Sequence, residues 1–414
     1  MLKLLQNPSQ IVTVNTNGKN YKQGKGQNKL DVLSRHSIVI EKDLIKDIIP
    51  NASVKNKSRY FVINVKDKVV LPGLVECHTH TVFAGSRSNE FKERLAGKSY
   101  EEMAKHGGGI IATVNSVRNT PLKKLVDLTL PKIQYFISQG ITTLEIKSGY
   151  GLDFENEIKM LKAINQLKEI FQIDIIATFL GAHTFPREYK KNRKKYISLI
   201  TNKMLPFISK NKLAHFCDGF CEAAAFSAKE IEQIFQTAKK LNFDLRLHAE
   251  QFNNIGGLET ALKFDAVSVD HLEMLKDNQI NKLKNSSTVA VLLPGVSFFL
   301  NYNYAPARKL IDNNIPVALS TDYNPGSSNI ANLGFIISLA ALKMNMTIEE
   351  TISSITINAA KVLKMNAKIG SIEINKKADF SVFNTNEYSD IVYNVGRNLN
   401  IMTIKNGKTI YNRK

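Results

Sequence analysis

Two of the chain's eight histidines stand one residue apart, in the stretch VECHTHTVFAG that begins at Val75. His78 and His80 close an apolar run, and residues i and i+2 of a strand point to the same side. Both imidazoles can therefore face one metal ion. A lone histidine at such a place is more often structural, whereas an HxH pair at the end of an apolar strand is a more specific sign of a metal site.

Three further histidines and one aspartate also stand at the ends of apolar runs: His183, His248, His271 and Asp322. Each of them alone is a weak signal, and His183 alone would be interpreted as a structural histidine. Their convergence on one rim would be hard to explain by chance. Three imidazoles and one carboxylate suit Zn²⁺ or iron (Fe²⁺ or Fe³⁺), with an open coordination position for water.

The elements that must position these residues follow from the alternation of the chain between residues 74 and 360. Longer amphipathic stretches, such as 155–170 and 227–242, separate eight short apolar runs, at 74–80, 141–149, 173–183, 212–220, 244–251, 266–272, 288–295 and 315–322. Eight strand–helix repeats predict a (β/α)8 TIM-like barrel. Its active site should lie at the C-terminal ends of the strands, where the histidines fall.

Both ends of the chain have a different pattern. Short strand-like pieces separated by Asn/Gly/Lys-rich turns occupy residues 1–73, and similar pieces return after about residue 365. We therefore expect a small β-sandwich domain built from residues 1–73 and 361–414, flanking a barrel of residues 74–360.

The composition excludes several other classes of protein. The net charge is +19, but the lysines are scattered and the dense run KKNRKK (190–195) lacks interleaved aromatic residues, so we expect no nucleic-acid partner. No apolar run reaches the roughly 18 residues of a membrane span, and no signal peptide is apparent. Three cysteines do not make a disulfide framework. We expect a cytoplasmic protein with free thiols and no membrane partner.

The placement of the metal-type residues resembles the metal-dependent amidohydrolases, which have HxH after the first strand, His after the fifth and sixth, and Asp after the eighth. Those proteins also carry a sandwich split between both termini. The longer motifs ECHTHTVFAGSR, LEIKSGYGL, FLGAHTFP, LHAEQF, VDHLE and STDYNPGSS are similar to those of the imidazolonepropionase family. This resemblance spans roughly residues 71–328 and implies hydrolysis of 4-imidazolone-5-propanoate to N-formimino-L-glutamate, in histidine degradation.

The resemblance also implies roles for single residues. One metal ion per chain, zinc or iron, would be held by His78, His80, His248 and Asp322. His271 would be catalytic, and Asp322 would also move the proton. The substrate would contact Arg87, Tyr150, His183 and Gln251, and the product would contact Asn324, Gly326 and Ser327. Some family members carry Glu in place of Gln251, so we assign Gln251 no proton transfer. A homodimer is also expected.

Several alternatives stay open at this point. The barrel could act on another cyclic amide or deaminate a base, or it could be a non-catalytic interaction protein. Tyr150 could be an ordinary loop aromatic and Arg87 a surface cation, while Lys147 could be carboxylated and bridge two metals, as in binuclear relatives. Three histidines match no motif and are expected to be structural or surface residues: His36, His106 and His215. No P-loop lysine follows the glycines 107–109, so they are expected to form a flexible loop near the site and no phosphate cradle.

Overall fold

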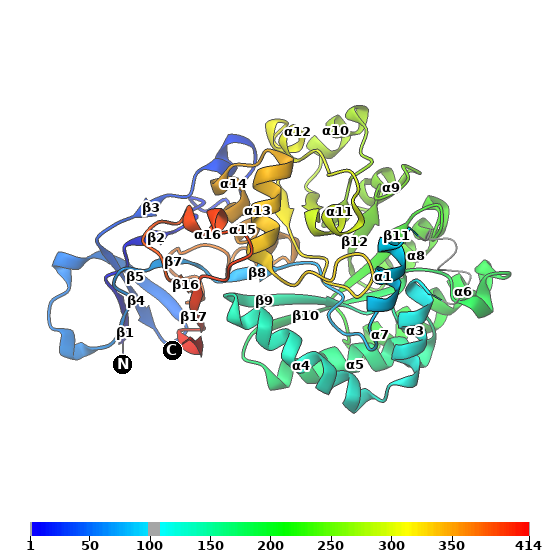
Figure 1. Cartoon of the computed structure of the whole chain (residues 1–414), viewed down its shortest axis with the longest axis horizontal. Coiled ribbons are helices and arrows are strands. Elements are labelled where there is room, and N and C mark those ends of the chain that lie inside the picture. Colours follow the sequence, from blue (N-terminus) through cyan, green and yellow to red (C-terminus); the bar gives the residue numbers. More distant parts are fainter. Residues whose placement is uncertain (1, 98–107, 414) are drawn as a thin grey trace.

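A parallel barrel forms the larger part of the molecule (Figure 1). The computed structural model describes residues 2–97 and 108–413. Eight parallel strands follow one another in chain order, and the bridge Thr79–Tyr323 joins the last to the first. The strands are β8 (Leu74–Glu76), β9 (Ile141–Lys147), β10 (Asp174–Ala182), β11 (Phe216–Cys221), β12 (Asp244–Ala249), β13 (Ser268–His271), β14 (Val289–Leu292) and β15 (Val317–Leu319). Each predicted run contains one strand, so the predicted barrel is confirmed.

Helices surround the barrel, and most of them bury their apolar faces in two core clusters that include strand residues. They are α1 (Ser88–Leu95), α3 (Ile110–Asn119), α4 (Leu122–Ser138), α5 (Phe154–Ile170), α6 (Arg193–Leu199), α7 (Leu205–Lys210), α8 (Ala228–Lys240), α9 (Gly257–Lys263), α10 (Asp277–Lys284), α11 (Pro294–Leu300), α12 (Ala307–Asp312), α13 (Leu333–Met344), α14 (Ile348–Ser354) and α15 (Ile357–Val362). Both helices expected from periodicity are present, as α5 and α8.

Local sequence explains where these helices begin. The carboxylate of Asp153 accepts the Asn156 amide at 2.7 Å and so caps α5. At α8 the Ser227 amide donates to the Glu230 carboxylate at 2.8 Å, which is the reciprocal contact of a capping box. Such caps satisfy amides that have no partner inside the helix.

Two further sheets pack against each other beside the barrel, on the side where both chain ends lie (Figure 1). One has the order β5-β4-β1-β6, with β1 (Leu2–Gln6), β4 (His36–Glu41), β5 (Leu44–Pro50) and β6 (Tyr60–Asn64). The other has the order β18-β17-β16-β7-β2-β3, with β2 (Gln10–Val12), β3 (Val32–Leu33), β7 (Val69–Pro72), β16 (Phe380–Phe383), β17 (Asn400–Lys405) and β18 (Lys408–Asn412). A short helix, α16 (Asp390–Tyr393), lies between β16 and β17.

The second of these sheets joins the two ends of the chain, as expected from the sequence. Strand β16 pairs with β7, and one shared cluster includes Leu5, Ile38, Val70, Phe380 and Ile404. Only Gly73 separates β7 from the first barrel strand, so the sandwich fixes where the barrel begins. The exact boundaries at residues 73 and 360 stay predictions.

The three cysteines and the described histidines without a motif lie in strands or directly beside them. Cys77, Cys217 and Cys221 are free and buried. No helix within the described residues is long and apolar enough to cross a membrane. His36 lies on β4 and His215 directly precedes β11, while His106 and Gly107 lie outside the described residues.

Candidate metal centre and active site

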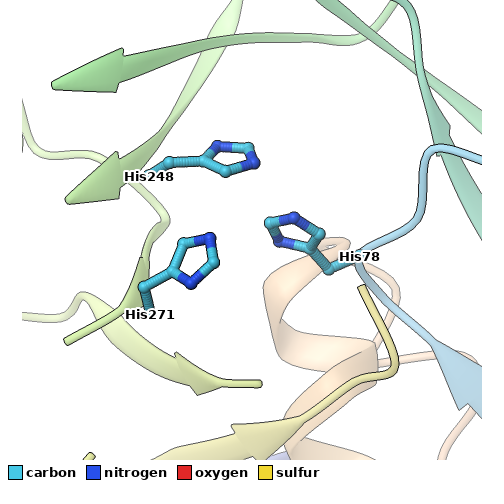
Figure 2. A group of neighbouring side chains, drawn as sticks. All are labelled: His78, His248 and His271. Carbon is cyan, nitrogen blue, oxygen red and sulfur yellow. The ribbon is translucent and has the colours of Figure 1, made fainter. Parts of the chain in front are cut away.

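Four histidines and one aspartate meet at the C-terminal ends of the barrel strands. His78 and His80 follow β8, His248 lies near the end of β12, His271 ends β13 and Asp322 follows β15. Figure 2 shows the rings of His78, His248 and His271 pointing toward one another from opposite sides of the barrel mouth. Their ring centroids are 4.5 Å (His78–His248), 5.4 Å (His248–His271) and 6.0 Å (His78–His271) apart.

Asp322 brings the second histidine of the HxH pair into the same group. Its Oδ1 lies 3.4 Å from His78 Nε2 and 3.2 Å from His80 Nε2. Burial by itself raises the pKa of Asp322, but the neighbouring imidazoles of His78 and His80 hold this pKa well below its usual value. The side chain is therefore an anion at neutral pH.

The atoms that face the centre of this group lack ordinary partners. Nε2 of His78, Nε2 of His248 and Oδ1 of Asp322 are buried and form no hydrogen bond. Unsatisfied buried polar atoms are costly unless something else binds them. There are two groups of residues whose potential ligand atoms all lie within 4.8 Å of one another. One group is His78, His248 and His271, and the other is His78, His80 and Asp322. This donor set suits a divalent transition metal such as zinc or iron.

Buried carboxylates hold the opposite ring nitrogens of two candidate ligand histidines, His78 and His248. Nδ1 of His78 lies 2.5 Å from Asp270 Oδ2, and Nδ1 of His248 lies 3.1 Å from Asp218 Oδ1. A carboxylate at Nδ1 fixes the ring orientation and leaves Nε2 free to bind a metal. Sequence reasoning missed both aspartates, although each lies inside a predicted strand and Asp270 directly precedes His271.

A layer of ion pairs below the histidines holds those two carboxylates. Arg246 Nη2 lies 2.7 Å from Asp270, while Lys147 Nζ lies 2.9 Å from both Asp218 and Glu145. All five side chains are completely buried. Burial and Arg246 lower the pKa of Lys147, but the carboxylates of Asp218 and Glu145 raise it overall. These contacts favour a charged Lys147 that pairs with carboxylates over a carboxylated lysine that bridges two metals.

His271 lies among the potential ligands, and its acidic neighbour is Glu273. Its Nδ1 lies 3.5 Å from Glu273 Oε1, and neither carboxylate oxygen of Glu273 forms a hydrogen bond. Burial opposes the charged form of His271, but Glu273, followed by Asp322 and Asp270, raises its pKa. Its backbone φ of 86° is rare for a residue with a side chain and marks a constrained strand end. Its predicted role as catalyst rather than ligand stays a prediction.

Tyr150 and His183 line the same mouth. The His183 ring stacks on His80 at a centroid distance of 5.3 Å, and Tyr150 lies 5.4 Å from His183 and 5.8 Å from His80. Burial and the neighbouring His80 lower the pKa of His183 to about 3, so this ring is neutral. Tyr150 is only 5% exposed, and so it belongs to the site rather than to an open surface loop.

Arg87 lies against the loop that follows the last barrel strand. A Cβ on Gly326 would come within 2.0 Å of Arg87 Nη1, so only glycine allows this approach. The other side of the guanidinium donates to Glu90 Oε2, from Nε at 3.0 Å and from Nη2 at 2.7 Å. Arg87 is therefore oriented rather than a freely moving surface cation, and Nη1 faces the rim.

The side chain of Asn324 is largely used inside its own loop. Its Nδ2 donates to the Asp322 carbonyl at 2.7 Å and to Asp322 Oδ2 at 3.1 Å. Its Oδ1 accepts the amides of Gly326 and Ser327, each at 2.8 Å. Asn324 thus orients the carboxylate of Asp322, a role that the sequence did not indicate. The predicted product contacts of Asn324, Gly326 and Ser327 stay predictions.

Gln251 stands on a loop that another buried carboxylate organises. Oε1 of Glu222 accepts the amides of Gln251, Phe252 and Asn253, at 3.1, 2.9 and 3.0 Å. The preceding Glu250 accepts the Leu258 amide at the start of α9, at 3.1 Å. Its carboxylate is thus engaged with α9, and Glu250 itself follows the end of β12 with a φ of 53°. The predicted substrate contact of Gln251 stays a prediction.

Comparison with known proteins gives the family. The amidohydrolase family model matches residues 69–410. An imidazolonepropionase of Fusobacterium nucleatum subsp. nucleatum is 40% identical over 413 residues, which are 99% of each chain. Another, of Caldanaerobacter subterraneus subsp. tengcongensis, is 44% identical over 336 residues, which are 81% of each chain. The chain belongs to the imidazolonepropionases of the amidohydrolase family. The resemblance seen in the sequence motifs is thereby confirmed.

Solved structures resemble the fold at much lower identity. A zinc-bound adenosine deaminase from Xanthomonas campestris has a TM-score of 0.73 at 16% identity, covering 99% of this chain and 93% of that one. A triazine hydrolase variant has a TM-score of 0.75 at 14% identity, covering 100% of this chain and 95% of that one. These likenesses extend over both barrel and sandwich and support the fold alone.

Proposed function

We propose that this imidazolonepropionase family member hydrolyses the cyclic amide of 4-imidazolone-5-propanoate to N-formimino-L-glutamate, in histidine degradation. The observation that carries the proposal is the set of buried ligand atoms without partners on His78, His248 and Asp322. We propose one metal ion per chain, zinc or iron, held by these three residues and His80. Family membership at 40% identity over nearly the whole chain supports the reaction.

The chemistry requires a strong nucleophile because a cyclic amide is a poor electrophile. A divalent metal held by His78, His80, His248 and Asp322 would lower the pKa of its water to about 7, and this would make hydroxide available at neutral pH. Asp322 is ionised and can accept the water proton and later return it to the leaving ring nitrogen. Asn324 restrains the Asp322 carboxylate during these transfers, through its 3.1 Å hydrogen bond.

The other rim residues have separate roles in this proposal. His271, close to His248 and backed by Glu273, stabilises the developing oxyanion or shares in proton transfer. Arg87 binds the propanoate carboxylate through its guanidinium. The remaining contacts are assigned to Tyr150, His183 and Gln251 for the substrate and to Asn324, Gly326 and Ser327 for the product.

A substrate panel followed by ultraviolet absorbance tests the proposed reaction. The purified protein should consume 4-imidazolone-5-propanoate and release N-formimino-L-glutamate, identified by mass spectrometry. Hydantoins, dihydropyrimidines, adenosine and triazines serve as matched controls for other cyclic-amide hydrolases and for base deaminases. Faster turnover of any control than of the imidazolone would contradict the proposal and favour that alternative.

The proposal extends to the state of the protein in the cell. We propose that the enzyme is cytoplasmic, in agreement with its three free buried thiols. We also propose that it forms a homodimer. Light scattering coupled to size exclusion should give twice the 46.4 kDa chain mass. A single-chain mass at micromolar concentration would contradict the dimer without affecting the reaction.

A further inference from the structure

The loop SGYGL, residues 148–152, has a strained backbone conformation that needs contacts from other residues to keep it in place. It joins β9 to α5 and carries Tyr150. Gly149 has φ of 104° and Leu152 has φ of 53°, both in the region that L side chains rarely adopt. A Leu in this region is strained, so other contacts must fix the loop.

One buried carboxylate supplies those contacts from the inside. Glu157, in the first turns of α5, accepts the amides of Gly149 at 3.1 Å, Gly151 at 2.8 Å and Leu152 at 3.0 Å. Its side chain is completely buried. Consecutive amides that converge in this way form a concave site for an anion, which the carboxylate fills. A Cβ on Gly151 would lie 2.3 Å from the Glu157 nitrogen, so the loop passes close against the helix start.

Contacts from the outside restrain the same loop. Arg118 Nε donates to the Gly151 carbonyl at 2.8 Å and also lies 3.1 Å from Asp153, the residue that caps α5. The Gly149 carbonyl in turn lies 2.9 Å from His183 Nδ1, so the loop also fixes one ring nitrogen of His183. The position of the loop therefore sets the places of both Tyr150 and His183.

We propose that Glu157 is a positioning residue of the active site, which places Tyr150 and His183 for the substrate by gathering the amides of the 148–152 loop. This inference rests on the proposed function, because it takes Tyr150 and His183 to be substrate contacts. Glu157 touches neither the substrate nor the metal ligands and acts through the loop alone. Nothing in the sequence motifs marked it, because it lies in an ordinary amphipathic helix.

Glu157→Gln is the direct test. Oε1 of Glu157 accepts all three amides, and Oε2 accepts that of Gly149 a second time, at 3.2 Å. Glutamine keeps a carbonyl oxygen for the three amides but places an NH₂ group against the Gly149 amide and removes the negative charge, so the loop loses part of its anchor. Under native conditions, the peptide covering residues 148–153 should exchange its amide hydrogens at least about tenfold faster. Displacement of positioning groups by about 1 Å can cost up to 10²-fold, so kcat/KM should fall by about 10- to 100-fold. Bound metal should stay unchanged.

Asp379→Asn is the matched control. Asp379 is also a buried carboxylate that accepts a backbone amide, that of Asn406 at 2.7 Å, but it lies beside β16. This variant should lower stability without changing exchange at 148–153 or kcat/KM. Arg118→Met weakens the loop from a side chain that is 23% exposed, and it should give the same changes at smaller size. It takes over the test if Glu157→Gln does not fold.

A double variant separates positioning from general destabilisation. Once Tyr150→Ala has removed the aromatic contact, adding Glu157→Gln should cost much less than it does in the wild-type protein. Full additivity, unchanged exchange at 148–153, or faster exchange with unchanged kcat/KM would each overturn the inference. Tyr150→Ala alone tests the underlying proposal. If that variant keeps full kcat/KM, the proposed substrate contact fails, whereas a loss there with no loss in Glu157→Gln overturns only the positioning role.

Discussion

Two layers of charged and polar side chains inside the barrel differ in how completely they are paired. In the lower layer Lys147 and Arg246 lie 2.7–2.9 Å from the carboxylates of Asp218 and Asp270. In the rim layer Nε2 of His78 and Nε2 of His248 form no hydrogen bond, and Asp322 Oδ1 has only imidazole nitrogens beside it, at 3.2–3.4 Å. Buried ionic groups are tolerated when paired and costly when not. The charges of the lower layer are therefore paired within the protein itself, whereas the rim atoms are arranged to bind a further group such as a metal ion.

Removal of a cation from the complete layer should have the largest effect on folding. Lys147→Met keeps the shape but leaves the carboxylates of Glu145 and Asp218 without their cation, and breaking a buried pair costs about 3–5 kcal/mol. Urea unfolding measures this loss. Lys239→Met, at an exposed pair with Asp265, is the control and should change stability by about 0.5 kcal/mol or less. Equal losses in the two variants would refute the distinction between the layers.

His271→Ala should have the largest effect on catalysis within the rim. We assign His271 to the transition state, where such groups contribute about 10²–10³-fold or more. kcat should fall by that factor while metal content, measured by elemental analysis, stays nearly unchanged. Loss of the metal together with activity would show that His271 is a ligand, and would correct the division of roles among the four rim histidines.

Arg87→Met should affect the substrate tail rather than the ring chemistry. A guanidinium–carboxylate contact is worth roughly 1.5–3 kcal/mol, or about 10- to 150-fold in kcat/KM. The loss should be much smaller on an amide or ester of the propanoate, and Arg87→Lys should recover only part of it. A coupling energy near zero between residue 87 and the carboxylate would show that Arg87 is a bystander.

Asp270→Asn tests whether the lower layer supports metal binding at the rim. The carboxylate holds His78 at Nδ1 and is itself held by Arg246. Loss of such an outer partner typically weakens metal affinity by about 10- to 100-fold. Competition with a chelator of known affinity gives the change. An affinity equal to that of the wild-type protein would mean that the lower layer stabilises the fold without supporting the rim.

The same two layers differ in how far the sequence predicted them. The rim histidines end apolar runs, so strand periodicity alone placed them at one edge of the barrel. Asp270 adjoins His271 in the chain but holds His78, which comes from β8, five strands earlier. Such a contact across the barrel depends on closure and register, which local patterns do not contain. Glu157 and Glu222 were missed for a related reason, because their targets are backbone amides and carry no sequence signal.

The sandwich was predicted in outline but not in its pairing. Turn-rich segments at both ends indicated strands, yet β1 (Leu2–Gln6) was not recognised as one, although it lies between β4 and β6 in its sheet. Its parallel pairing with β6 joins residues about sixty positions apart. Long-range pairing of this kind is set by burial of the whole face, as in the cluster of Leu5, Ile38 and Phe380.

Metal content measured beside activity tests the central claim most directly. Elemental analysis of the purified protein should find close to one zinc or iron per chain. Chelation should abolish turnover of the imidazolone, and added Zn²⁺ or Fe²⁺ should restore it. His78→Ala, which removes the residue shared by both groups of potential ligands, should lose metal and activity together. Full activity in metal-free protein would contradict the account.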